Sequence, residues 1–350
     1  MKNNKFIKFE NSKLTNKYKM NVKDIDLCGL GNGLVDLLYE VSFEELEQLG
    51  LRKGEMRLVD DTLQKKLLEK LAGRSYTICS GGSAANTIIA FSQFGGTSAY
   101  HTVVGDDDFG RFYVNEFNEL GISINAPMIN EPTGTCIVLI TPDSERTMNT
   151  SLGATAHFGV EHITPDYIRR AKWVYLEGYK FTAEKSTEAL FFAIELAKKH
   201  EAKISLSLSD VFVITNFFDK VLEAIKHIDL LFCNEIEALT LTETSNIDQA
   251  KRKLTSLVPN FVITLGAKGS IANINKSEYQ FPAYSTKAID TTGAGDMFAG
   301  AFLFGLIQKG DINFAGHLAS LSSSRIVSQF GARLKDNHKE IINQLEKQLL

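Results

Sequence analysis

The segment from Asp290 to Asp296 reads Asp-Thr-Thr-Gly-Ala-Gly-Asp and combines small residues with a carboxylate that could act beside an anion. Apolar residues follow it at helical spacing, so Gly293, Ala294 and Gly295 are expected at the N-terminus of a helix. Free N–H groups and the helix dipole favour an anion there, and glycine lets a phosphate approach the backbone. Asp296 would then lie in the first helical turn, beside that anion.

A carboxylate next to a phosphate site is repelled by it, so Asp296 is expected to have a chemical role. It is well placed to act as general base for a hydroxyl that attacks a phosphoryl group, a role typically worth about 10²–10⁴ in rate. The competing interpretation is an ordinary first turn in which Asp296 only stabilises the helix dipole.

Three other familiar motifs do not fit this chain. No G-x-x-x-x-G-K-[ST] sequence is present, which excludes a P-loop enzyme. The turn from Gly29 to Leu34 ends in leucine where a dinucleotide-binding turn needs glycine or alanine. The stretch from Gly81 to Ala85 lacks the last glycine of a nucleophile elbow.

Strand-like and helix-like segments alternate along most of the chain, which predicts an α/β fold with a mostly parallel sheet and helices on both faces. The predicted strands are 24–30, 172–177, 202–208, 229–233 and 260–265, and the predicted helices are 83–94, 186–200, 221–228, 247–258, 292–309 and 315–329. Two stretches, 34–59 and 133–149, do not follow this alternation. We expect them to form a small β-rich lid that excludes water from the end of the sheet.

Composition narrows the class of protein. The chain has 350 residues, 44% hydrophobic residues and a formal net charge of -4, so it can bury a large core and nothing indicates nucleic-acid binding. No apolar run is long enough to span a membrane. The four cysteines are far apart, which argues against zinc and disulfides and favours free thiols in a cytoplasmic protein.

The first 23 residues form a basic N-terminal extension, with seven lysines and only one acid, Glu10. It is either an arm for an anionic surface or a solvated terminus.

Taken together, the motifs resemble the ribokinase, or PfkB-type, family of carbohydrate and nucleoside kinases. The second signature of that family is similar to 290–296, and its first signature is similar to the Gly-Gly-Ser-Ala-Ala-Asn-Thr run at 81–87. An Asn-x-x-Glu element appears at 234–237, after a predicted strand. The resemblance covers 24–331 and implies a three-layer αβα sandwich, with a small lid, over 24–350.

Within the family, the chain resembles the adenosine kinases, including bacterial ones. The substrate turn at 31–36, the lid strand at 132–136 and the Glu-Arg-Thr-Met-Asn-Thr run at 145–150 are similar to theirs. The resemblance implies an ATP-dependent phosphotransferase that makes AMP from adenosine, with Asp296 as base. A sugar kinase, an inosine or guanosine kinase and a non-catalytic binding protein remain the alternatives.

The resemblance also implies a role for each matching residue. The implied anion hole consists of Gly293, Ala294 and Gly295, and the implied substrate site of Asn32, Asp36, Gly81, Gly82, Asn86, Arg146 and one aromatic ring of Tyr179 or Phe181. The implied ATP site consists of Asn234, Thr264, Gly266, Lys268, Gly269 and Asp290. Glu237 would hold Mg²⁺ through water, and a monovalent cation such as K⁺ would lie near Asp290. Lys268 could instead be a lysine of a surface turn, and Arg146 could instead pair with Glu145.

One departure concerns the acceptor. Adenosine kinases tend to place aromatic residues together after a glycine, whereas here Lys180 separates Tyr179 from Phe181. This leaves the acceptor, rather than the reaction, in question. The expected partners are ATP and a small molecule, and the chain is expected to be a monomer or a homodimer.

Overall fold

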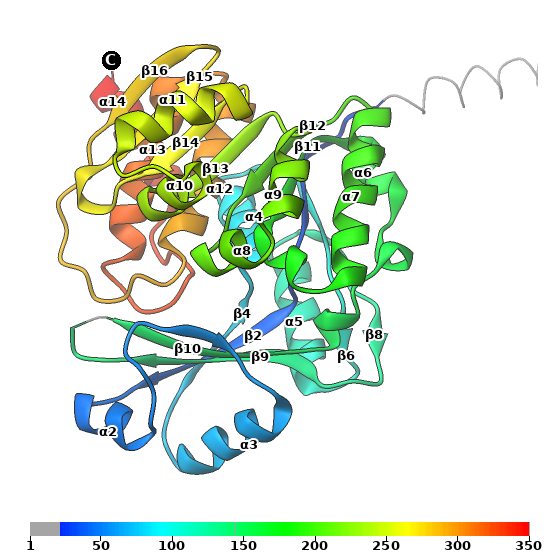
Figure 1. Ribbon diagram of the computed structural model, residues 1–350, viewed down its shortest axis with the longest axis vertical. Coiled ribbons are helices and arrows are strands. Elements are labelled where there is room, and N and C mark those ends of the chain that lie inside the picture. The colour runs from blue at the N-terminus through cyan, green and yellow to red at the C-terminus, as the bar shows by residue number, and fades with distance from the viewer. Residues whose placement is uncertain (1–21, 144, 350) are drawn as a thin grey trace, which may run out of the picture.

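A computed structural model of the protein describes residues 22–143 and 145–349 (Figure 1). Residues 1–21 of the predicted N-terminal extension lie outside the described part of the chain. No helix within the described residues is both long and apolar enough to cross a membrane.

The main body is built on a nine-stranded sheet, in the order β16-β15-β14-β13-β12-β11-β1-β5-β7. The strands from β7 to β14 are parallel, and β15 and β16 are added antiparallel. Their bounds are β1 Ile25–Leu30, β5 Ser98–His101, β7 Ser123–Asn125, β11 Ala171–Glu177, β12 Lys203–Ser207, β13 Leu230–Asn234, β14 Phe261–Thr264, β15 Ser270–Ile274 and β16 Ser277–Phe281.

Helices cover both faces of this sheet, as expected for right-handed crossovers between parallel strands. One face packs against α4 (Ser83–Gln93), α5 (Asp108–Glu119), α12 (Ala294–Phe304), α13 (Ile312–Ile326) and α14 (His338–Leu349). The other face packs against α6 (Pro165–Arg170), α7 (Glu184–Lys199), α8 (Val211–Asn216), α9 (Phe218–Ile225), α10 (Glu235–Thr242) and α11 (Ile247–Leu257). The predicted three-layer α/β architecture is therefore confirmed.

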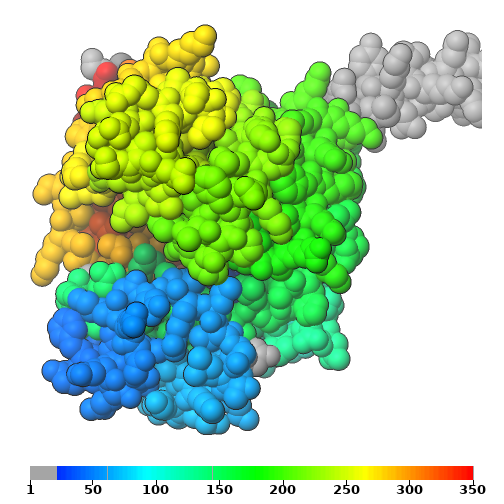
Figure 2. Space-filling view, in the orientation of Figure 1, coloured from blue at the N-terminus to red at the C-terminus, as the bar shows by residue number. Residues whose placement is uncertain are grey.

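A second, five-stranded sheet lies below the main body in Figure 1 and forms the lid. Its order is β3-β10-β9-β2-β4, with bounds β2 Leu34–Glu40, β3 Met56–Leu58, β4 Thr77–Gly81, β9 Thr133–Ile140 and β10 Arg146–Gly153. The outer face of the lid is covered by α2 (Phe43–Gln48) and α3 (Asp61–Lys70). A separate two-stranded ribbon pairs β6 (Val104–Gly105) with β8 (Met128–Ile129). Figure 2 shows the blue, N-terminal part of the lid lying against the larger body.

The lid is larger than the two stretches that the sequence analysis proposed for it. Strand β4 pairs with β2 along its whole length, and β10 runs on to Gly153. Strand β4 also leads directly into α4, so the lid is joined to the helix that carries the first glycine motif.

Two helices, α4 and α12, meet closely behind the site. Gly300 makes this possible, because a Cβ there would lie 2.6 Å from the carbonyl oxygen of Thr87. The predicted helix at 292–309 is a regular α-helix from Ala294 to Phe304, followed by a π-helical turn at Gly305–Lys309. The close approach of α12 to α4 brings Asp296 next to the first turn of α4.

Candidate active site

A cavity of about 570 Å³ lies between the lid and the carboxyl ends of the parallel strands. It receives side chains from the first glycine motif, from the Asn-x-x-Glu element, from the 290–296 loop and from the lid. The sequence-predicted residues that line it are Asn32, Asp36, Gly82, Asn86, Arg146, Tyr179, Asn234, Glu237, Thr264, Gly293, Ala294, Gly295 and Asp296. Segments far apart in the sequence therefore meet at one cleft, where open α/β sheets bind ligands.

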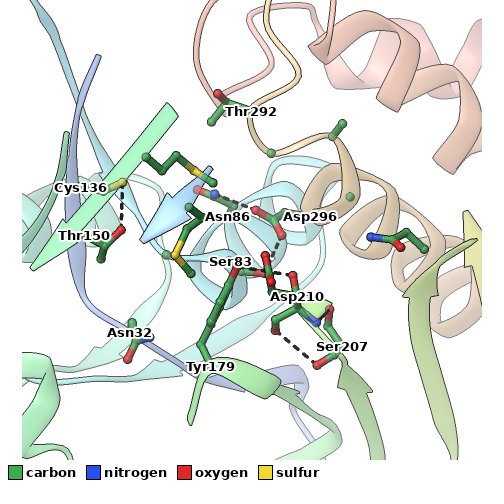
Figure 3. Close-up of a pocket in the computed structure, with 18 of the residues that line it drawn as sticks. Asn32, Ser83, Asn86, Cys136, Thr150, Tyr179, Ser207, Asp210, Thr292 and Asp296 are labelled. Carbon is green, nitrogen blue, oxygen red and sulfur yellow. Dashed lines mark hydrogen bonds between the residues drawn. The ribbon is translucent and has the colours of Figure 1, made fainter. Parts of the chain in front are cut away.

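The carboxylate of Asp296 is held by two side chains from α4 (Figure 3). The Ser83 hydroxyl donates to one oxygen at 2.7 Å, and the Asn86 amide donates to the other at 2.9 Å. Removal from water raises the pKa of Asp296, while these two hydrogen bonds and the charges of Arg146 and Arg333 oppose that rise. The two oxygens of Asp296 are therefore oriented by these two hydrogen bonds.

The anion hole has the local geometry that the sequence predicts. Gly293 is the N-cap of α12 with φ of 71°, a left-handed conformation that favours glycine, and no side chain caps the helix. A Cβ at Gly295 would meet no atom within 4 Å, so the space in front of this helix end is open. The Ala294 N–H donates to the Thr291 carbonyl oxygen at 3.3 Å, and no side chain of the N-cap residue binds the N–H groups that follow.

Arg333 was not anticipated from the sequence and connects three parts of the site. Its guanidinium donates to Asn86 Oδ1 at 2.6 Å, to the hydroxyl and carbonyl oxygens of Ser80, and to Glu116 Oε1 at 3.3 Å. Because an arginine can only donate, this contact fixes the Asn86 amide with its NH₂ group toward Asp296. Arg333 lies in an irregular segment after α13, where no spacing pattern distinguishes it from a surface residue.

Asp36 lies in the middle of the lid sheet and is 7% exposed. Burial raises the pKa of Asp36 to about 7, and Arg333 supplies the strongest opposing charge. Gly81 leaves room for Asp36, because a Cβ at Gly81 would lie 2.2 Å from Asp36 Oδ1. Gly82 leaves room for the neighbouring turn, because a Cβ there would lie 2.3 Å from the Asn32 carbonyl oxygen. Gly81 therefore serves the site by making space rather than by lining the cavity.

The turn after β11 decides which aromatic residue reaches the cavity. It is a 3₁₀ helix at Gly178–Thr182, in which residues three apart lie on the same side. Tyr179 and Thr182 line the cavity, whereas Phe181 is fully buried in the core on the α6–α11 face. The expectation that Phe181 could contact the substrate is therefore wrong.

The Asn-x-x-Glu element forms a capping box at the start of α10. Asn234 Oδ1 accepts from the Glu237 N–H at 2.8 Å, and Glu237 Oε2 accepts from the Asn234 N–H at 3.0 Å. Burial raises the pKa of Glu237 to about 7. No group of three or more histidine, cysteine, aspartate or glutamate side chains able to hold a metal is found among the described residues. A Mg²⁺ ion would fit Glu237 only with phosphate oxygens and waters as its main ligands.

Four of the residues predicted for the nucleotide lie outside the cavity lining. Gly266 and Gly269 lie on the loop after Thr264, and Lys268 on that loop is exposed and pairs with Glu235 at 2.9 Å. Asp290 is completely buried, and its oxygens accept from the N–H groups of Thr292 and Gly331, both at 2.8 Å. These contacts hold the loop in shape, and a contact of Asp290 with nucleotide stays a prediction.

Arg146 reaches the cavity from the lid, as expected. Its Nε is buried and has no hydrogen-bond partner within the described part of the chain. Its charge lowers the pKa of both Asp36 and Asp296 against the effect of burial. The lid thus brings a cation to the side of the cavity that faces the two carboxylates.

Comparison with known proteins agrees with this geometry. The model of a family described as pfkB family carbohydrate kinase matches residues 54–339. Adenosine kinase of Saccharomyces cerevisiae is 28% identical over 326 residues, which is 86% of this chain and 95% of the yeast protein.

Two bacterial crystal structures are similar over nearly the whole chain. Adenosine kinase from Sinorhizobium meliloti has a TM-score of 0.87 and 30% identity, and covers 92% of this chain and 99% of that chain. A probable sugar kinase from Rhizobium etli has a TM-score of 0.88 and 28% identity, and covers 93% of this chain and 99% of that chain. The predicted resemblance is confirmed: the protein belongs to the pfkB family of carbohydrate kinases, and it is a phosphotransferase that acts on an alcohol group.

Proposed function

We propose that the protein is an ATP-dependent nucleoside kinase that phosphorylates the 5′-hydroxyl of adenosine. The observation that carries this proposal is the set of apolar side chains that line the cavity together with its polar groups, and we call this apolar part the slot. The slot is lined by Leu34, Met56, Leu58, Val138, Met148, Leu152, Tyr179 and Phe212. A planar base has the shape and surface to fill such a slot, whereas a free pentose would leave it open to water.

The polar end of the cavity suits a ribose. An ionised Asp36 can accept hydrogen bonds from two neighbouring hydroxyls, and the Asn32 side chain lies at the same end. Tyr179 lines the same cavity, and its hydroxyl donates to the Ser209 carbonyl oxygen at 3.5 Å. A nucleoside in this orientation directs its 5′-hydroxyl toward Asp296.

Phosphoryl transfer would then take place at the N-terminus of α12. Asp296 accepts the proton of the 5′-hydroxyl, the N–H groups after Gly293 bind the transferring group, and Arg146 adds positive charge from the lid. ATP would supply the phosphoryl group, and Glu237 would hold, through water, a Mg²⁺ ion that could neutralise phosphate charge. The lid excludes water, which would otherwise compete as acceptor.

A panel of acceptors tests the substrate assignment. We expect adenosine to give a higher kcat/KM than ribose or fructose in an ADP-release assay, because a free sugar leaves the apolar part of the cavity empty. We expect adenosine also to exceed inosine, because the chain is similar to adenosine kinases. A preference for ribose or fructose would overturn the nucleoside assignment and leave the family assignment intact. A preference for inosine would overturn adenosine as the acceptor and leave the nucleoside assignment intact.

The acidic side of the pH profile gives a second test. Burial raises the pKa of Asp36 to about 7, so this carboxyl becomes neutral below that pH and can no longer accept from two hydroxyls. The pKa of Asp296 is also raised, and its protonation removes the base. We therefore expect kcat/KM for the nucleoside to fall as the pH drops below about 7. A kcat/KM that is constant from about pH 5 to about pH 8 would contradict these roles.

A further inference from the structure

Lys180 lies between Tyr179 and Phe181 in the sequence, but its side chain has different surroundings from theirs. It is 2% exposed and lies three residues after Glu177, which is completely buried. Because Glu177 precedes a 3₁₀ turn, the two side chains lie on the same side of that turn. Both side chains contact Asn32, which lies in the turn between β1 and β2.

Every polar atom of Asn32 except one has a partner in the protein. The backbone N–H donates to Glu177 Oε1 at 2.7 Å, and the carbonyl oxygen accepts from the Tyr100 hydroxyl at 3.2 Å. The side-chain Oδ1 accepts from Lys180 Nζ at 2.7 Å and from the Thr155 hydroxyl at 3.3 Å. Among the described residues, only the Nδ2 group of Asn32 makes no hydrogen bond to protein.

The contact with Lys180 determines which way the amide of Asn32 faces. An ammonium group has three donors and no acceptor, so the Asn32 atom that lies 2.7 Å from it must be the oxygen. Thr155 agrees with this orientation, because its hydroxyl accepts from the Gly33 N–H at 3.2 Å and donates to the same oxygen. With both lone pairs of Oδ1 in use, Asn32 can offer the cavity only its NH₂ group.

We propose that Lys180 is a positioning residue that holds the Asn32 amide as a hydrogen-bond donor toward a sugar hydroxyl of the acceptor. This rests on the proposed function of the cavity. Asp36 then serves as acceptor for the hydroxyl hydrogens and Asn32 as donor to a hydroxyl oxygen, so one hydroxyl is bound from both sides. A freely rotating amide could present its oxygen instead, which would face Asp36 as a second acceptor.

The charge balance around Lys180 supports this role. Burial of an ammonium group is costly unless other groups compensate it. Here the Glu177 carboxylate supplies the opposite charge and also accepts from the Ala84 N–H at 2.7 Å, in the first turn of α4. The Nζ also lies 4.5 Å from the centroid of the Phe158 ring, which adds a cation–π contact. Glu177 and Lys180 thus connect the substrate turn to α4, whose Ser83 and Asn86 bind the Asp296 carboxylate.

A double-mutant cycle tests the proposal. Steady-state kinetics with adenosine would be measured for the wild type, Lys180→Met, Asn32→Ala and the double variant. We expect Lys180→Met alone to raise the KM for adenosine about tenfold and to change kcat by less than about threefold, since one substrate hydrogen bond is lost. In the Asn32→Ala background the same change should have almost no effect on KM, because the amide that Lys180 orients is absent.

Two variants keep the result interpretable. Lys185→Met makes the same chemical change at an exposed position on α7 and should leave KM unchanged. If Lys180→Met does not fold because Glu177 is left unpaired, the combined change Lys180→Met with Glu177→Gln, in which neither charge remains, takes its place in both arms of the cycle. Equal effects of Lys180→Met with and without Asn32 would overturn the proposal. If the wild type prefers another acceptor, the adenosine assignment fails, and the same cycle on that acceptor still tests Lys180.

Discussion

Replacing Asp296 with asparagine is expected to lower kcat by about 10²–10⁴ while nucleoside and ATP still bind, because the variant removes the base and keeps the shape of the side chain. The new amide fits its surroundings. Its oxygen can accept from Asn86, and its NH₂ group can donate to the Ser83 hydroxyl, which can turn to accept. Loss of activity would then not reflect misfolding.

The measurement is single-turnover phosphoryl transfer, together with calorimetric titration of adenosine and of an ATP analogue. Asp219→Asn is the matched control, because it makes the same change at an exposed position in the first turn of α9. Asp296→Asn turnover within about threefold of the wild type would remove Asp296 from the role of base. A variant that no longer binds adenosine would instead show that Asp296 holds the substrate.

Replacing Arg333 with methionine is expected to lower both stability and activity. The change leaves Asn86 Oδ1, the Ser80 carbonyl oxygen and Glu116 without their shared donor. Loss of a largely buried charged donor should lower the free energy of unfolding by about 3 kcal/mol. Once Asn86 is free to turn, Asp296 loses its orientation, and kcat should fall by between about tenfold and about 100-fold.

The pH profile separates this effect from simple destabilisation. Arg333 is the strongest charge that lowers the pKa of Asp36, so Arg333→Met should move the acid limb of kcat/KM to higher pH. Arg325→Met is the matched control, since Arg325 is more exposed and pairs with Asp336 at the surface, a contact worth about 1 kcal/mol or less. If the two variants unfold at the same denaturant concentration and have the same kinetics, Arg333 does not orient Asp296 through Asn86.

The sequence was informative wherever a function depends on residues close together in the chain. The glycine turn before Asp296, the Asn-x-x-Glu element and the alternation of strands and helices are all local patterns. Each follows from short-range rules of helix ends, caps and periodicity. These patterns were enough to predict the α/β fold, and their resemblance to the ribokinase family implied the family and the phosphotransferase class, which the comparisons confirm.

The tertiary structure was needed wherever residues far apart in the chain meet. Arg333 acts on Asn86 across 247 positions, and Lys180 acts on Asn32 across 148. Neither contact has a periodic signal, because a lysine or arginine in a loop has the same local pattern whether it is buried or solvated.

The five-residue 3₁₀ turn after β11 also shows that the sequence does not reveal which way neighbouring side chains point. The sequence shows Tyr179, Lys180 and Phe181 in a row, and a strand or a helix would orient them differently. Only the folded turn directs Tyr179 to the cavity, Phe181 to the core and Lys180 to Asn32. The sequence by itself thus determined the reaction class, since its chemistry is encoded in contiguous motifs. The arrangement that orients the reacting groups was decided by long-range packing, which depends on the whole fold.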